Sequence, residues 1–349
     1  MRQGSSGSGR SVTLEEVARV AGVSRATASR VVNGSPKVNP QARRGVERAI
    51  ARLGYVPNRA ARSLVTRRSD SIGVVIREPT ARLFGDPYFP QLLSGISAAL
   101  SPRGLQLILL MPRSREEDRR LEQYLTAGHI DGVLLASLHG NDPLPGRLDG
   151  DGIPVVVGGR PPEGVRVSFV DNDNYGGAVA AVSHLIASGR HTVATISGPL
   201  DMEAGVARLR GYREALRSAG RSLDPSLEAE GEFTQESGAQ AMRALLQRHP
   251  ELDAVFVASD LMAAGALQVL NAAERRVPDD VAIVGFDDSP IALMTVPPLS
   301  TVRQSIEEMG REMVRLLLES IDERDRAPRQ VILVTELILR GSCGGGPMS

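Results

Sequence analysis

The sequence predicts an α/β protein in which an N-terminal helix-turn-helix head precedes a two-lobed core of parallel sheets. Three short helical patterns occupy residues 13–54. From residue 72 onward, apolar strand-like runs alternate with amphipathic helices in two successive series, which is typical of parallel sheets covered by helices. The first 70 residues carry 14 basic and 4 acidic side chains, and the remainder carries 27 and 37. A head of charge +10 on a body of −10 indicates a separate module for a polyanion, although the whole chain sums to zero.

The composition excludes several classes of protein. With 349 residues, 42% hydrophobic and 23% charged, the chain is long enough for two or three domains and too apolar to be mainly disordered. Its single cysteine, Cys343, excludes a disulfide framework and a cysteine-based metal site. No apolar run approaches the roughly 18 residues of a membrane span. Residues 1–10 read as a disordered leader without a secretory signal, so we expect a cytoplasmic protein with no membrane partner.

The predicted head covers residues 11–56. Thr13 to Glu16 form a capping box that starts the first helix, and Gly22 ends it. Ser24 caps a second helix that stops at Asn33-Gly34, and Asn39-Pro40 begins a third that ends at Gly54. Two short helices joined by residues 21–24 form a helix-turn-helix pattern, whose second helix can enter a DNA major groove.

The second helix carries the side chains that suit DNA. Arg25 and Arg30 can pair with guanine edges, and the hydroxyls of Ser24, Thr27 and Ser29 suit phosphates. The alternative is an ordinary three-helix bundle with solvated arginines. The positive charge of the head favours DNA binding over that alternative.

The core is predicted from the order of its strands and helices. Strands are expected at 72–76, 105–110, 132–136, 154–158, 193–197, 254–258 and 281–286, and helices at 89–100, 116–127, 175–188, 207–219, 237–249 and 262–273. A helix at 305–320 and a strand at 331–339 complete the lobes after a crossover. We therefore expect one lobe from 70–160 plus 300–325, a second from 161–296 plus 326–341, and a flexible tail at 342–349.

The head closely resembles the DNA-binding head of LacI/GalR-family repressors. The matching segments are residues 12–18, 22–27, 29–34 and 53–64. The resemblance implies that residues 57–69 form a hinge helix and linker, disordered off DNA, in which Leu64 wedges into the minor groove; a plain interdomain linker is the alternative. The DNA contacts that we expect are Thr13, Ser24, Arg25, Ala26, Thr27, Ser29, Arg30, Asn33, Asn58, Ala61 and Leu64.

The body resembles the family's effector-binding core, which is similar to periplasmic sugar-binding proteins. Six motifs occur in the expected order, at 171–177, 184–185, 208–212, 259–263, 284–288 and 297–302. The resemblance covers the chain from Ser11 to about Ser342. It implies a ligand cleft at the carboxyl ends of the strands.

The resemblance also implies which residues bind the effector. Arg208 would be a charged clamp, Asp287 a carboxylate acceptor and Phe233 a stacking platform, while Tyr88 and Phe89 form a wall from the first lobe. Ser259 stands where sugar-binding relatives often carry Asn, which weakens the case for a sugar. Tyr88 and Phe89 in the core, and Asp287 as a helix cap, are the structural alternatives. Residues 78–86 form a longer connection than usual, and the sequence leaves open whether they shape the site or close it as a lid.

The predicted function is a ligand-responsive, sequence-specific DNA-binding transcriptional regulator, expected to be a repressor. It would bind a near-palindromic operator as a homodimer and respond to a small molecule between the lobes, with sugars the commonest class in the family. Inducer and corepressor logic both stay open.

Two other classes compete with this interpretation: a solute-binding protein of a transporter, and a cleft enzyme of the α/β class. The basic head argues against the first. Against the second, the sequence contains no Walker loop and no Gly-x-Gly-x-x-Gly, His-Glu-x-x-His or Gly-x-Ser-x-Gly motif. We expect no catalytic residue, no metal site and no cofactor.

Overall fold

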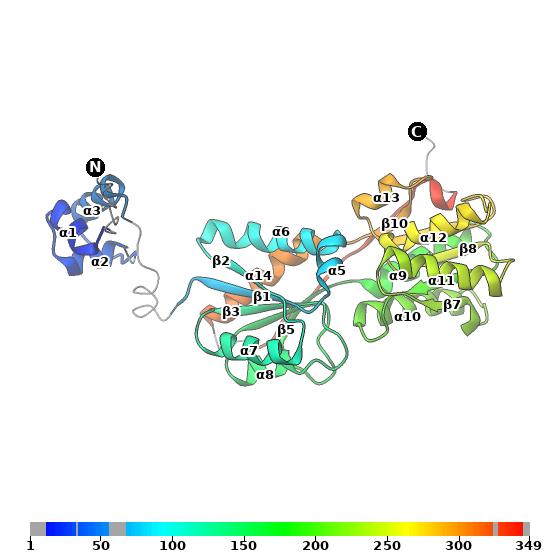
Figure 1. Cartoon of the computed structure of the whole chain (residues 1–349), viewed down its shortest axis with the longest axis horizontal. Coiled ribbons are helices and arrows are strands. Elements are labelled where there is room, and N and C mark those ends of the chain that lie inside the picture. The colour runs from blue at the N-terminus through cyan, green and yellow to red at the C-terminus, as the bar shows by residue number, and fades with distance from the viewer. Residues whose placement is uncertain (1–11, 33, 56–67, 324–326, 345–349) are drawn as a thin grey trace, which may run out of the picture. The chain divides into compact units, whose positions relative to one another are not determined.

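The computed structural model describes residues 12–32, 34–55, 68–323 and 327–344. The chain divides into two compact units between Ser69 and Asp70, which is the boundary that the charges indicate (Figure 1). The predicted leader and nearly all of the predicted hinge segment fall outside the described residues. Among the helices that the structure does describe, none combines the length and the apolar character needed to cross a bilayer.

The first unit confirms the helix-turn-helix pattern, with helices α1 (Leu14–Ala21), α2 (Arg25–Val32) and α3 (Pro40–Leu53). The Thr13 hydroxyl accepts from the Glu16 amide at 3.3 Å, and the Glu16 carboxylate accepts from the Thr13 amide at 2.8 Å. Gly22 ends α1 with φ 67°, a conformation that favours glycine. The three helices enclose a small core of Val17, Ala18, Ala28, Val31, Val46 and Ala49. This core fixes α2 with its polar side outward.

The first lobe of the second unit is a six-stranded parallel sheet in the order β11-β5-β4-β3-β1-β2 (Figure 1). Its strands are β1 (Ser71–Ile76), β2 (Gln106–Leu110), β3 (Gly132–Ala136), β4 (Val155–Gly158), β5 (Ser168–Asn172) and β11 (Gln330–Leu333). Its helices are α5 (Thr80–Gly85), α6 (Tyr88–Leu100), α7 (Arg115–Thr126), α8 (Leu144–Gly150) and α14 (Ile306–Asp322). One apolar cluster lies between the sheet and α6 with α14, and another lies under α7 and α8.

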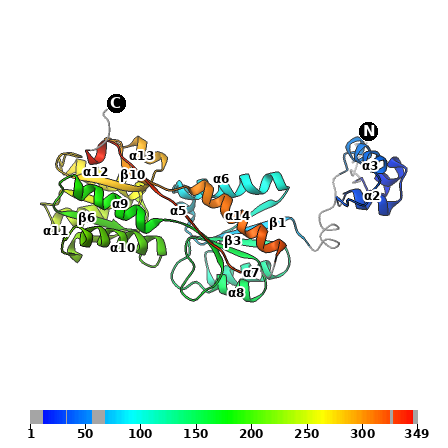
Figure 2. The same cartoon turned by 180° about the vertical axis from the view of Figure 1, so that it is seen from behind.

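The second lobe repeats this plan of a sheet covered by helices (Figure 2). Its sheet order is β12-β10-β9-β8-β6-β7. Its strands are β6 (Val193–Ser197), β7 (Glu228–Glu230), β8 (Ala254–Val257), β9 (Ala282–Asp287), β10 (Ser300–Arg303) and β12 (Glu336–Ile338). Its helices are α9 (Asn174–Ala187), α10 (Glu203–Ser218), α11 (Gln235–Arg248), α12 (Asp260–Ala272) and α13 (Pro290–Met294). The pairing of β10 with β12 is antiparallel, and the other pairs are parallel.

The predicted lobe boundaries are wrong at three strands. β5 and β11 pair with each other in the first lobe, whereas the sequence predicts residues 161–172 and 326–333 in the second. β10 belongs to the second lobe, because it pairs with β9 and β12. The chain therefore crosses between the lobes after β5, after β10 and after β11. Alternating strands and helices show where strands lie, but not which sheet each strand joins.

Two predictions near the C-terminus also need correction. The single strand expected at 331–339 is two strands, because the segment leaves one sheet after Leu333 and enters the other at Glu336. The tail expected to be flexible from residue 342 begins with the buried residues Ser342 and Cys343. The Ser342 hydroxyl donates to the Ile283 carbonyl at 2.7 Å and accepts from the Ser300 amide at 2.8 Å. These hydrogen bonds fix the segment to the second lobe. The Gly-rich sequence does not indicate them.

The contact between α11 and α12 leads to a stability prediction. A Cβ added at Gly265 of α12 would lie 1.9 Å from the carbonyl oxygen of Gln235 in α11. We expect Gly265→Ala to lower the free energy of unfolding by about 1–3 kcal/mol, because the helices must move apart. Gly150→Ala is the matched control, since its Cβ would meet no atom within 4 Å. Urea unfolding of both variants is the measurement, and equal midpoints would contradict the close contact.

Candidate functional site

A cleft opens between the lobes at the carboxyl ends of their parallel strands. It encloses about 720 Å³, which includes space open to solvent. All six residues predicted to bind an effector line it: Tyr88, Phe89, Arg208, Phe233, Ser259 and Asp287. Such a position is where open α/β sheets place their ligands. That these residues bind the effector stays a prediction.

Arg208 is a fixed cation in the floor of the cleft. It comes from α10 and is only 5% exposed. Its Nε donates to Asn174 Oδ1 at 2.9 Å, its Nη1 donates to the Ala258 carbonyl, and its guanidinium carbon lies 3.8 Å from the centre of the Phe286 ring. No hydrogen bond within the described residues uses Nη2, so this group retains donors for a ligand.

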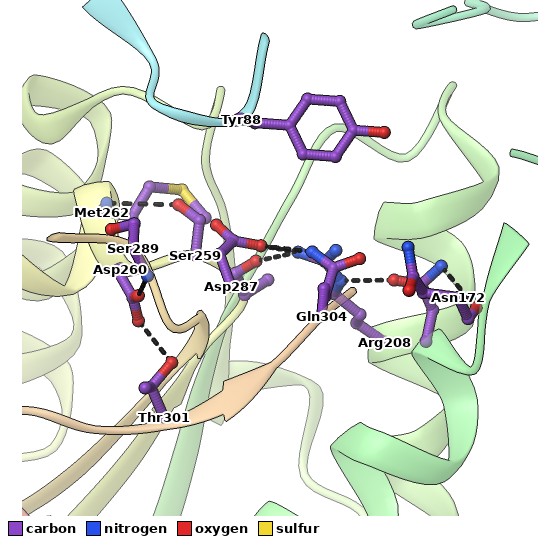
Figure 3. Close-up of polar contacts among 12 residues, drawn as sticks. Tyr88, Asn172, Arg208, Ser259, Asp260, Met262, Asp287, Ser289, Thr301 and Gln304 are labelled. Carbon is purple, nitrogen blue, oxygen red and sulfur yellow. Dashed lines mark hydrogen bonds and ion pairs between the residues drawn. The ribbon is translucent and has the colours of Figure 1, made fainter. Parts of the chain in front are cut away.

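Asp287 lies beside Arg208 at the end of β9, with its Oδ1 3.4 Å from Arg208 Nη1 (Figure 3). Gln304 Nε2 donates to the same oxygen at 2.6 Å. Burial raises the pKa of Asp287 to about 7, although the charge of Arg208 opposes the rise. Near neutral pH this carboxyl can therefore donate or accept a hydrogen bond. The predicted alternative is a cap on the segment that follows. Within the described residues the Asp287 carboxyl bonds Arg208, Gln304 and the backbone of Asp260, and no hydrogen bond joins it to that segment.

Asp287 should make stability depend on pH. An unfolded carboxyl ionises near pH 3.9, whereas in the folded protein Asp287 holds its proton to about pH 7. Between these two pH values the folded state binds a proton that the unfolded state has lost. The contribution of Asp287 to the free energy of unfolding therefore falls as the pH rises through that window. We expect the stability of Asp287→Asn relative to the native chain to rise from about pH 4 to about pH 7 and then to level off. Urea midpoints across this range test the prediction, and a constant difference would contradict it.

The aromatic residues form opposite walls of the cleft. Tyr88 and Phe89 begin α6, and their rings meet edge to face at 5.3 Å between centroids. Phe89 also packs in the core of the first lobe. It therefore lies both in the core, which was the structural alternative, and in the cleft wall. Phe233 lies in the second lobe with φ 53° and its ring 5.1 Å from the guanidinium carbon of Arg82. Tyr88 reaches from the first lobe over the polar groups of the second (Figure 3).

Ser259 has a structural role in addition to lining the cleft. Its hydroxyl accepts from the Met262 amide at 3.2 Å and so caps α12. The next residue, Asp260, is fully buried and accepts from the Ser289 amide at 2.7 Å and from the Thr301 hydroxyl at 2.6 Å (Figure 3). Burial raises the pKa of Asp260 well above its usual range. These bonds hold the strand ends that carry Asp287.

Sequence reasoning missed much of the polar lining: Arg82, Asp86, Arg160, Asn172, Asn174 and Gln304. Arg82 and Asp86 show that the segment 78–86 shapes the cleft, since it forms α5 with Leu83 buried beneath it. Asp171 also lines the cleft, where burial raises its pKa to about 6 against the opposing charge of Arg160. The motif at 171–177 was a usable signal for Asp171, Asn172 and Asn174. Gln304 had none, because its position depends on β10 joining the second sheet.

Two buried polar atoms in this lining lack hydrogen-bond partners within the described residues. They are Asn172 Oδ1 and Arg82 Nε. An unsatisfied buried acceptor or donor costs about 1–3 kcal/mol.

Apart from Thr13 at the start of α1, the predicted DNA-contacting residues that the structure describes lie on α2 and at its start. Arg25, Ala26 and Arg30 are exposed on α2. The Ser24 hydroxyl accepts from the Thr27 amide at 3.2 Å, so it caps α2, as Thr13 caps α1. Arg25 forms an exposed ion pair with Glu15 at 2.5 Å, which the sequence did not reveal. Asn33, Asn58, Ala61 and Leu64 lie outside the described residues.

Two family models match the chain. The model described as bacterial regulatory proteins, lacI family, matches residues 13–58, and the model described as a periplasmic binding protein-like domain matches residues 182–343. The first match covers the head, and the second lies wholly within the core.

Full-length relatives are similar to the chain. The HTH-type transcriptional regulator CelR of Thermobifida fusca is 53% identical over 333 residues, 95% of this chain and 98% of the relative. The ribose operon repressor of Escherichia coli K12 is 34% identical over 334 residues, 95% of this chain and 99% of the relative. Both are transcription regulators, so neither the transport alternative nor the enzyme alternative is favoured.

Solved structures agree in fold. The transcriptional regulator CelR–cellobiose complex has a TM-score of 0.76 at 50% identity, with 95% of this chain and 99% of that chain covered. The lac repressor dimer bound to operator and the anti-inducer ONPF has a TM-score of 0.83 at 27% identity, with 96% and 99% covered. Head, core and whole-chain similarity point the same way, and the protein belongs to the LacI family of bacterial transcription regulators.

Proposed function

We propose that this regulator is a cytoplasmic repressor that binds operator DNA as a homodimer and responds to cellobiose or a closely related β-linked glucose oligosaccharide. The observation that carries the proposal is the likeness, at 50% identity over 95% of this chain, to a structure titled as a CelR–cellobiose complex. The cleft supports it independently, because its lining combines what sugars require: polar groups for hydroxyls and apolar faces for the ring.

The polar groups of the cleft suit a neutral sugar. Arg208 offers donors, and Asp171 and Asp287 offer carboxyl groups. Asn174 accepts from Arg208, and Gln304 donates to Asp287, so these amides hold in place the two charged groups that extend further into the cleft than the short side chain of Ser259. Tyr88 and Phe233 offer apolar faces from the two lobes.

The homodimer is supported by an exposed apolar surface on the second lobe. Leu293 and Met294 at the end of α13 are 66% and 77% exposed, and Val296 is 82% exposed. Adjacent large apolar side chains in water mark an interaction surface. We assign this surface to contact with a second copy, because a helix-turn-helix protein binds the two half-sites of a near-palindrome as a dimer.

The proposed DNA contacts comprise α2, its cap and Thr13, together with Asn33 and the hinge residues Asn58, Ala61 and Leu64. Within α2 the two arginines carry the sequence readout. We expect Arg30→Ala to weaken binding to the cognate operator by about 1–3 kcal/mol and to relax base preference at one position. Arg48→Ala on α3 removes the same charge from the head and is the control. An equal loss on operator and random duplex would contradict base recognition.

The sugar can be identified by calorimetry on the full-length protein with cellobiose, cellotriose, maltose and ribose. We expect cellobiose or cellotriose to bind and ribose to fail. A ligand at 100 times its dissociation constant also stabilises the fold by about 2.7 kcal/mol, which a thermal melt detects. If no β-linked glucose oligosaccharide binds, the proposed effector is wrong.

A further inference from the structure

A chain of polar contacts joins the two lobes outside the cleft. His139 follows β3 in the first lobe, and Asp201 follows β6 in the second. His139 Nδ1 lies 3.0 Å from Asp201 Oδ2, and the Gly140 amide donates to the Asp201 carbonyl at 2.7 Å. Neither His139 nor Asp201 lines the cleft. The contact therefore depends on the position of the lobes and not on the ligand surface.

The first-lobe side of this contact is rigid. His139 Nε2 lies 3.0 Å from Oε1 of Glu78, which is 6% exposed and also accepts from the Ser137 hydroxyl. Arg82 Nη1 donates to the same Glu78 oxygen at 2.6 Å. Burial raises the pKa of Glu78, but the His139 hydrogen bond and the charge of Arg82 outweigh it and hold that pKa below its usual value. Glu78 is thus a carboxylate held in place to orient the His139 ring.

The second-lobe side is anchored as well. Arg82 of the first lobe connects it to the cleft. The Leu200 amide donates to Glu230 Oε1 at 3.0 Å, which fixes the loop that carries Asp201. Met202, next in that loop, lies with its sulfur 3.9 Å from Arg82 Nη1. Arg82 also lines the cleft and sits over the Phe233 ring. Arg82 therefore lines the ligand site and contacts both the second lobe and Glu78.

We propose that His139 and Asp201 are positioning residues that latch the lobes in the closed arrangement, so that they set the affinity for the effector without touching it. The inference rests on the proposed sugar site. Closing two lobes on a ligand is favoured by every contact that exists only when they are closed. The His139–Asp201 pair and the Gly140–Asp201 hydrogen bond are such contacts, because each joins one lobe to the other.

The latch predicts a pH dependence of sugar binding. The charged groups that line the groove around His139 are Arg77, Glu78, Arg82, Asp142, Asp201 and Glu232. The hydrogen bond to Glu78, with a further contribution from Asp201, raises the pKa of His139 against the effect of burial. Opening the lobes removes Asp201 but leaves Glu78, which belongs to the same lobe as His139. The closed state therefore binds the proton more tightly, and its advantage falls as the pH rises through the raised pKa.

The test is a double-mutant cycle on the full-length protein with cellobiose as the probe. We expect His139→Gln and Asp201→Asn each to weaken cellobiose binding about three- to tenfold at about pH 6, as a charge-assisted hydrogen bond at a half-exposed site requires. The double variant should be no weaker than the worse single variant. His191→Gln and Asp149→Asn, at exposed sites with the same chemical changes, should bind as the native chain does.

The pH profile separates the latch from the cleft carboxyls. Asp171 and Asp287 titrate in all variants. The part of the pH dependence that comes from His139, whose pKa is raised by its hydrogen bonds to Glu78 and Asp201, should disappear in Asp201→Asn. Single variants that bind normally, a double loss equal to the product of the single losses, or an unchanged pH profile would each overturn the latch.

A measurement without sugar keeps the latch distinct from the proposed effector. The Gly140 amide bonds the backbone of Asp201, so neither side-chain substitution removes its partner. We expect hydrogen exchange at Gly140 to be faster in His139→Gln and Asp201→Asn than in the native chain and the two controls. If cellobiose does not bind the native chain but exchange accelerates, the effector proposal fails and the latch stands. Unchanged exchange refutes the latch whatever the sugar does.

Discussion

The Arg208→Met variant is expected to lose sugar binding by about 100-fold or more, because the substitution removes charge-assisted hydrogen bonds to a buried ligand. Methionine keeps the length and much of the volume of the side chain, so the packing against Phe286 is largely preserved. The carboxyl of Asp287 loses its cation, but its pKa, already raised to about 7 by burial, lets it take a proton. The fold should survive while the ligand site does not.

Calorimetry with the sugar and operator binding without it are the two measurements for this variant. Apo operator binding should equal that of the native chain, since Arg208 lies in the core unit and the DNA contacts lie in the head. Arg217→Met is the matched control, because Arg217 is on the same helix but 58% exposed. An Arg208→Met protein that still binds the sugar within about threefold would remove Arg208 from the site.

The second large effect is expected at the apolar surface of Leu293, Met294 and Val296. Met294→Asp places a charge in the proposed dimer contact and should give a monomer with an intact fold. The monomer should bind the operator at least about 100-fold more weakly, because the second half-site no longer benefits from the link between two heads. Light scattering reports the mass, and operator titration reports the affinity.

Val334→Asp is the control for this substitution. Val334 is 84% exposed between β11 and β12 and does not belong to the surface of Leu293, Met294 and Val296. It should leave both the mass and the operator affinity unchanged. A Met294→Asp protein that stays dimeric, or a monomer with undiminished operator affinity, would contradict the assigned surface.

The head could be predicted almost completely because its signals are local. Each helix start and stop depends on residues within one turn, as the Thr13–Glu16 capping box and Gly22 show. The alternation of strands and helices in the core is local too, and most of those elements occur where expected. The Arg25–Glu15 ion pair was missed, since it joins two helices whose relative position is not written in either one.

The assignment of strands to sheets could not be predicted, because pairing is a long-range property. β5 and β11 lie side by side although more than 150 residues of chain separate them. The same reason hid Gln304 and the latch: Gln304 reaches Asp287 only once β10 has joined the second sheet, and His139 meets Asp201 only across the lobes. The six predicted cleft residues were accessible only through the resemblance to the LacI/GalR family, because Tyr88, Phe89 and Phe233 belong to none of the motifs at strand ends.

The central claim is that a sugar in the cleft controls DNA binding by the head. The most direct measurement is the affinity of the full-length protein for a labelled duplex that it has itself selected from random sequences, with and without saturating cellobiose. The proposal predicts a change of at least about tenfold, typical of coupling between two sites, and no change for Arg208→Met. An operator affinity that is the same with and without every β-linked glucose oligosaccharide tested would contradict it.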